Sequence, residues 1–158
     1  MGWGDALPFA DSSFDLITAN MVMEHVKDPV RILSEVRRVL RPGGRFLFHT
    51  PNFKYYLIFI AWLIPDFIKN KIIWLLERRA EEDVFPTYYR LNTSSRVRAL
   101  AAQSGFEVKE VEIGGSVGSL EALGPVGVLE VFILKALSWR WLRDFSVTLI
   151  AVLVKPAR

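Results

Sequence analysis

The first third of the chain shows apolar and polar runs in the order of a strand, a helix and a second strand. The apolar run over residues 14–19 follows a polar turn and predicts a buried strand. Asp28 and Pro29 predict a helix start, because an aspartate side chain can cap the first turn and proline suits its first position. Apolar residues then recur at helical spacing and predict one buried face, formed by Ile32, Leu33, Val36, Val39 and Leu40.

The motif Pro42-Gly43-Gly44 predicts the end of this helix, and residues 45–50 predict the next strand. A strand, a helix and a strand joined by short links indicate a parallel βαβ unit. His49 lies at the end of the second strand, and we expect it to have a structural role only.

The later part of the chain predicts one more helix and two more strands. The helix begins at Thr93, ends at Gly105 and turns three apolar residues inward: Val97, Leu100 and Ala101. Residues 108–113 predict a half-exposed strand, because charged residues alternate with its apolar ones. The nearly unbroken apolar run over residues 147–154 predicts a strand buried on both faces.

Two blocks, about 53–90 and 115–143, do not fit this pattern and are predicted to be insertions in a single partial domain over residues 1–158. The apolar run over residues 55–64 is about half of the roughly twenty residues that a membrane-spanning helix needs. Both blocks combine basic residues with tryptophan at helical spacing. They suit either a lid over an active site, which we favour, or contact with a membrane surface.

Composition sets limits on the function. The chain has 158 residues, of which 51% are apolar, enough for one sizeable core. Its formal net charge of +3 is too small and too dispersed to indicate a nucleic-acid partner. The absence of cysteine excludes disulfides, thiolate metal sites and a cysteine nucleophile. The N-terminus carries no signal-peptide pattern, so we expect a cytoplasmic protein, peripheral to the membrane if the insertions bind one.

A series of short motifs in residues 4–50 resembles the class I S-adenosylmethionine (SAM) dependent methyltransferases, in particular their type 11 group. Each motif alone is weak, but their order and spacing are specific: Gly4-Asp5-Ala6, Leu7-Pro8-Phe9, Asp11-Ser12-Ser13-Phe14-Asp15, Glu24-His25-Val26, Asp28-Pro29 and Val39-Leu40-Arg41-Pro42-Gly43-Gly44. The resemblance implies an α/β fold, with the last four strands of a Rossmann-like methyltransferase sheet and two apolar helical insertions. It also implies transfer of a methyl group from SAM to an unidentified acceptor, which the apolar insertions suggest is lipophilic.

The resemblance further implies which residues hold the cofactor. Asp5 would accept a hydrogen bond from the adenine amine, with Ala6 and Leu7 beside it on the adenine side. Ala19, Asn20 and Met21 would follow the carboxyl end of a strand and lie near the methionine part of SAM. Open α/β sheets bind their ligands at this edge.

Glu24 and His25 are the candidate catalytic residues, because histidine can act as a base near neutral pH and a carboxylate can orient it. The alternative is a polar pair at the start of a helix. Related quinone O-methyltransferases associate a Glu-x-x-Glu-His string with a divalent metal. Here the first position of that string is Met21, whose thioether is a poor ligand for a hard cation, so we expect no metal site.

The glycine-rich SAM turn of the family, of the Gly-x-Gly-x-Gly type, does not occur in these 158 residues, nor does the acidic residue that would hold the ribose. We therefore expect impaired SAM binding and weak or no activity by this chain alone. We also expect the strand at residues 14–19 to form an open sheet edge. That edge would pair with a missing N-terminal half of the domain or with a second copy. The alternative function is a non-catalytic interaction or membrane-surface protein derived from a methyltransferase half-domain.

Overall fold

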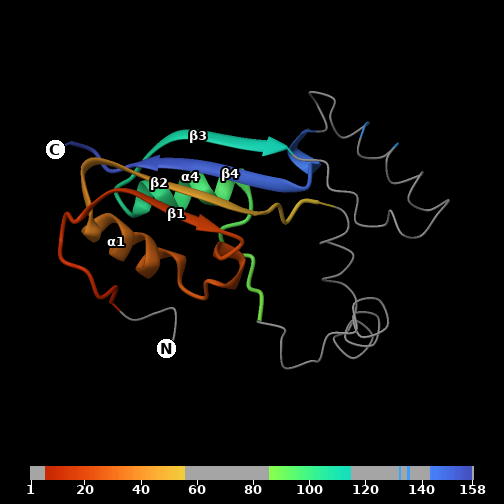
Figure 1. The fold of residues 1–158 in the computed structure, drawn as a ribbon. Coiled ribbons are helices and arrows are strands. Elements are labelled where there is room, and N and C mark those ends of the chain that lie inside the picture. Colours follow the sequence, from red (N-terminus) through yellow and green to blue (C-terminus); the bar gives the residue numbers. More distant parts are fainter. Residues whose placement is uncertain (1–5, 56–85, 115–131, 133–134, 136–142, 158) are drawn as a thin grey trace.

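The computed structural model describes residues 6–55, 86–114, 132, 135 and 143–157. These residues form one four-stranded sheet with two helices, in the mixed α/β arrangement that the sequence predicted (Figure 1). The elements are β1 (Phe14–Asn20), α1 (Pro29–Val39), β2 (Leu40–Pro51), α4 (Ser94–Gln103), β3 (Glu107–Gly114) and β4 (Thr148–Val154). Two short 3₁₀ turns, Met23–His25 and Arg143–Phe145, lie outside them.

The strands run in the order β1-β2-β4-β3. β1 and β2 are parallel, which confirms the predicted βαβ unit, whereas β4 is antiparallel to both β2 and β3. The carboxyl ends of β1, β2 and β3 therefore share one edge of the sheet with the amino end of β4. Asn20, His49 and Ile150 lie side by side in the register of that edge.

Helix α1 forms where its capping signals predicted. The backbone N–H of Arg31 donates to Asp28 Oδ1 over 3.1 Å, and Pro29 occupies the first turn. The predicted apolar face is buried, and Leu33 is 0% exposed. The end of the helix differs from the prediction. α1 ends at Val39, because Leu40 is already extended and begins β2 before the Pro42-Gly43-Gly44 motif.

Helix α4 is capped at both ends. The Thr93 hydroxyl accepts from the backbone N–H of Arg96, and Val97 and Ala101 are buried. Gly105 follows the helix at a φ of +73°, a left-handed conformation that side chains rarely adopt. A Cβ there would also lie 3.1 Å from the Arg37 Nε, so α1 closes against this turn.

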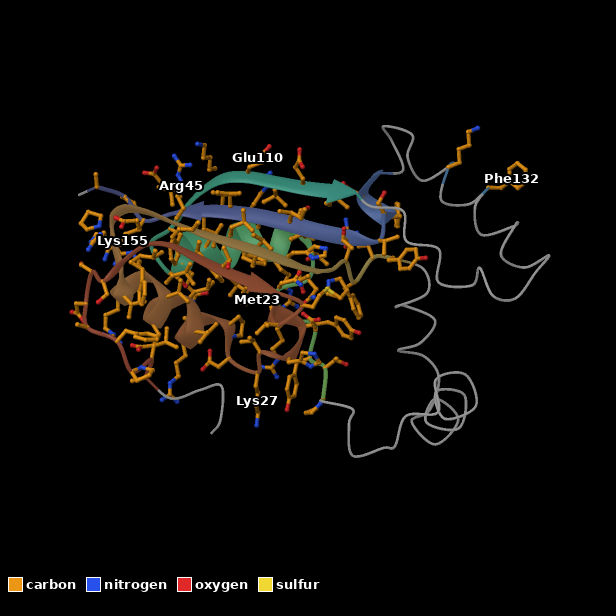
Figure 2. The ribbon with its side chains drawn as sticks, in the orientation of Figure 1. Met23, Lys27, Arg45, Glu110, Phe132 and Lys155 are labelled. Carbon is orange, nitrogen blue, oxygen red and sulfur yellow. The ribbon has the colours of Figure 1, made fainter. Side chains whose placement is uncertain are left out.

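Both helices pack on one face of the sheet and enclose the core. Along β2, the side chains of Phe46, Phe48 and Thr50 are buried on that face, opposite Leu153, Ala151 and Leu149 of β4. The other face is open among the described residues, and Figure 2 shows Arg45 and Glu110 on the side of the sheet away from α1.

The prediction that residues 147–154 form a strand buried on both faces was wrong, and the strand predicted to be buried over residues 14–19 is partly buried, on one side only. In β4, Ile150 is 38% exposed, and in β1, Leu16 is 57% exposed. Both side chains are on the face that α1 and α4 do not cover. A continuous apolar run shows that a strand is apolar on both faces. Which of these faces is buried depends on where the helices pack.

The structural predictions for the two insertions fall mostly on residues 56–85 and 115–142, almost all outside the described residues. The insertions, the lid and the membrane contact therefore stay predictions. Within the described ranges, no helix combines the length and the apolar character that crossing a membrane requires.

Replacement of Phe48 by alanine should lower the free energy of unfolding by about 3–5 kcal/mol, because it removes a fully buried ring from the core between the sheet and the helices. Phe145→Ala makes the same chemical change at a side chain that is 45% exposed, and it should cost far less. Urea unfolding of both variants measures the difference. Equal losses would contradict the core described here.

Candidate functional site

The carboxyl edge of β1 brings together three of the predicted cofactor residues. Asn20 ends the strand, and Met21 turns the chain at a φ of +51°. The Met21 backbone N–H donates to the His49 carbonyl over 2.9 Å, which ties this turn to the end of β2. Ala19 packs partly against the core, whereas the Met21 side chain is 45% exposed.

His49 takes part in this edge, although the sequence analysis gave it no functional role. Its Nδ1 lies 2.8 Å from the Asn20 Oδ1. An amide oxygen only accepts, so His49 donates here, and the Asn20 amide N–H groups remain as donors. This pairing orients Asn20 from the neighbouring strand.

Glu24 lies on the face of the sheet that the helices cover, where Thr50 is also buried. Its exposed fraction is 4%. Its Oε2 accepts from the Thr50 hydroxyl over 3.0 Å, and the Thr50 oxygen accepts from Asn92 Nδ2 over 2.7 Å. Asn92 also donates to the Pro51 carbonyl over 2.9 Å. This buried polar chain, Glu24–Thr50–Asn92, joins three segments far apart in the sequence.

The buried polar chain is held by backbone bonds as well. The Glu24 carbonyl accepts from the backbone N–H of Tyr88 over 2.7 Å and of Tyr89 over 3.2 Å. The Asn92 Oδ1 is buried and has no hydrogen-bond partner among the described residues. Residues 86–92 therefore return to the sheet directly beside the candidate catalytic pair.

His25 is placed differently from Glu24. Its side chain is 31% exposed, and its Nε2 lies 3.9 Å from Glu24 Oε1. The ring Nδ1 lies 3.0 Å from the Pro86 carbonyl, which only accepts, so this nitrogen carries the proton. In the neutral ring, Nε2 then carries the lone pair and can accept a proton. The two candidates thus meet, with Glu24 inside the protein and His25 at its surface.

On the predicted adenine side, the segment after residue 5 is attached to α1. The Leu7 N–H donates to Glu35 Oε2 over 2.9 Å, and the Leu7 carbonyl accepts from Arg38 over 3.0 Å. Arg38 also donates to the Phe9 carbonyl over 2.9 Å and to Asp11 over 2.6 Å. We call Glu35 and Arg38 the α1 clamp.

The clamp residues are paired with each other as well, over 2.9 Å. The hydrogen bond from Arg38, followed by that from the Leu7 amide, lowers the pKa of the Glu35 carboxyl below its ordinary value of 4.5. The hydrogen bonds with Glu35 and Asp11 raise the pKa of Arg38. Both side chains therefore remain charged near neutral pH.

The described contacts do not bring the two groups of predicted cofactor residues together. Leu7 is bonded to α1, whereas Asn20 is bonded to β2. Ala6 is described beside Leu7, but Asp5 is outside the described residues. Across the described ranges, no three histidine, aspartate or glutamate side chains gather in a way that would hold a metal ion.

Known proteins resemble this chain in sequence and in fold. Residues 2–48 match the family model for a methyltransferase domain. Over 46 residues the chain is 50% identical to a probable S-adenosylmethionine-dependent methyltransferase of Mycolicibacterium smegmatis, and the match covers 29% of this chain and 18% of that protein.

Two solved structures share the fold. A putative methyltransferase of Haloferax volcanii, in complex with the Trm112 methyltransferase activator, aligns with a TM-score of 0.56 at 20% identity. The alignment covers 98% of this chain and 60% of that one. A SAM-dependent methyltransferase from Mesorhizobium loti aligns at 0.55 and 22% identity, over 95% of this chain and 65% of that one.

The sequence match over residues 2–48 and the shared fold support a class I SAM-dependent methyltransferase. Its four-stranded α/β sheet is of the Rossmann-like kind found in those structures. This chain spans less than two thirds of the length of the two solved structures.

Sequence reasoning missed several residues that the methyltransferase fold brings to the candidate site. Thr50 gave no signal because its partner Glu24 is 26 positions away, and Asn92 gave none because its partner Thr50 is 42 positions away. The sequence analysis gave Glu35 and Arg38 no role, because they lie off the predicted apolar face of the helix. A charged pair three residues apart is common on exposed helices, so the pattern does not reveal a loop bound to it.

Thr50→Val keeps the shape of the side chain but removes the hydroxyl between Glu24 and Asn92. Both buried groups lose a partner, so we expect a loss of about 1–3 kcal/mol in the free energy of unfolding. Thr50→Ser should restore most of it. The matched control is Thr18→Val, an exposed threonine on β1. A Thr50→Val variant as stable as the control would show that the buried polar chain contributes nothing.

Glu35 should make the free energy of unfolding depend on pH. Because its pKa is lowered by folding, its contribution is present above pH 4.5 and is lost as the pH falls through the lowered value. Glu35→Gln should therefore lose less stability than the wild type between about pH 5 and pH 3. Urea unfolding at several pH values measures this, with Glu107→Gln on β3 as the matched control. An unchanged pH dependence in Glu35→Gln would contradict the clamp geometry.

Proposed function

We propose that this chain forms part of the active site of a SAM-dependent methyltransferase. The observation that carries the proposal is the family match over residues 2–48, combined with the polar carboxyl edge of parallel strands to which those residues lead. When bound, SAM supplies a sulfonium methyl group for in-line displacement by the acceptor. The protein contributes mainly by positioning the two reactants.

The residues of this chain fit one side of the cofactor. Asp5, Ala6 and Leu7 would hold the adenine. Ala19, Asn20 and Met21 would lie at the methionine part, where the Asn20 amide donors suit a carboxylate. The chemistry of these residues supports the assignment. The Asn20 amide offers uncharged donors on the methionine side, and Asp5 offers an acidic acceptor on the adenine side.

We further propose that His25 accepts the proton of the methyl acceptor and that Glu24 stabilises the charged ring. Two features support these roles: the exposure of His25 and the 3.9 Å separation between its Nε2 and Glu24 Oε1. Burial and the bond to Thr50 keep Glu24 itself away from a substrate. The exposed side chains of Met21 and Tyr88, at 45% and 39%, suit a lipophilic acceptor beside this pair.

The glycine-rich turn and the ribose-binding acid would come from polypeptide outside these 158 residues, so we propose that this chain alone binds SAM weakly. The open edge of β1 supports this proposal. Among the described residues β1 pairs only with β2, so it is the first strand of the sheet. A missing N-terminal half, or a second copy of the chain, would cover this edge. The same edge also favours the alternative function, a non-catalytic interaction protein.

Calorimetry with SAM tests the proposed function. We expect weak or no heat from the chain alone and clear binding once a polypeptide carrying the glycine-rich half of a type 11 methyltransferase domain is added. In that complex, Asp5→Asn should weaken binding about tenfold or more, because it removes a charged acceptor from the adenine amine.

The control is Asp15→Asn, which changes an exposed, ion-paired aspartate on β1 and should leave SAM binding intact. Absence of binding in both arms would contradict the methyltransferase proposal and favour the interaction protein. Strong binding by the chain alone would contradict only the need for a second polypeptide.

A further inference from the structure

We infer that Glu35 and Arg38, the α1 clamp, are positioning residues for the adenine side of the cofactor. This inference rests on the proposed function, because it assigns the adenine contact to the segment that begins at Asp5. Neither residue would touch SAM. They would act through the backbone of residues 6–11, whose path they fix.

The clamp holds both polar groups of one residue. Glu35 accepts from the Leu7 N–H, while Arg38 donates to the Leu7 carbonyl, at 2.9 Å and 3.0 Å. Leu7 lies two positions after Asp5 and one after Ala6. With both groups of Leu7 bonded, the peptide planes on either side of its Cα are fixed relative to α1.

Arg38 then continues along the same segment. Its guanidinium binds the Phe9 carbonyl and the Asp11 carboxylate, in addition to Leu7 and Glu35. Four acceptors on one side chain need the forked donors of arginine, and a lysine ammonium does not reproduce this geometry. If Arg38 only stabilised the helix, its pairing with Glu35 would be sufficient, and the bonds to the loop would not be required.

The segment is fastened to α1 at its far end too. The backbone N–H groups of Ser12 and Ser13 donate to the carbonyls of Arg38 and Val39, at 3.0 Å and 2.7 Å. The Phe9 and Phe14 rings meet edge to face at 5.0 Å between centroids. Helix α1 is itself buried along one face, so a rigid element sets the position of the loop.

A fixed loop matters for binding because ordering a backbone residue costs conformational entropy. If the clamp holds residues 6–11 before SAM arrives, binding does not bear this cost. Loss of the clamp should therefore weaken SAM binding even though every residue predicted to contact SAM is unchanged.

The test uses the full chain and two readouts. The first is amide hydrogen exchange of residues 7–11 without any ligand, in wild type, Arg38→Met and Arg37→Met. Arg37 lies next to Arg38 on α1 but donates to Gly105, away from this loop. The second readout is SAM affinity of the same variants, measured with the added glycine-rich half.

We expect faster exchange at residues 7–11 and about tenfold weaker SAM binding for Arg38→Met, with both unchanged for Arg37→Met. Arg38→Lys should fall between the wild type and Arg38→Met, and it serves as the second variant if Arg38→Met does not fold. Circular dichroism and urea unfolding report folding, so a loss of stability is separated from a loss of binding.

If residues 7–11 of Arg38→Met exchange as slowly as in the wild type, the positioning role is wrong. The same holds if Arg38→Met binds SAM as tightly as the wild type. Either result leaves the proposed function intact. Equal weakening in Arg37→Met would also overturn it, since the effect would then belong to the helix as a whole. If the wild-type complex binds no SAM, the proposed function fails, and the cofactor role of the clamp fails with it.

Discussion

The alternation of side chains along β2 is the constraint on which both the core and the candidate site depend. Phe46, Phe48 and Thr50 are buried against the helices, while Leu47 and His49 are on the opposite face. The last two residues of this alternation reach different partners: Thr50 binds Glu24, and His49 binds Asn20. A slip of one residue in register would reverse both faces, so the packing of two phenylalanines also sets the polar contacts at the edge.

The buried polar chain is costly unless all of it forms. A carboxylate that is 4% exposed would be strongly destabilising without the Thr50 hydroxyl, and that hydroxyl is in turn bonded to Asn92. Such a chain fixes the geometry of the turn that carries His25. It also makes residues 86–92 part of the site, although the sequence places them far from the methyltransferase motifs.

Helix α1 has two functions in this arrangement. Its apolar face closes the core over β2, and its polar side holds the segment before β1 through Glu35 and Arg38. The stability of the sheet and the position of the proposed adenine contact thus depend on the same helix. The family match ends at residue 48, so it includes the whole of α1.

The sequence by itself determined the local elements and the resemblance to the type 11 methyltransferases. Capping at Asp28 and Thr93, the apolar face of α1 and the type 11 motifs depend on neighbours within a few positions, and such patterns are readable directly. The tertiary structure alone decided which faces are buried, since apolar runs look alike whether helices cover one face of a strand or both. It also decided that Glu24 is internal and His25 external, and that Arg38 binds the loop before β1. Those outcomes depend on contacts between residues 26 to 61 positions apart, where strand order and helix placement, rather than local pattern, choose the partner.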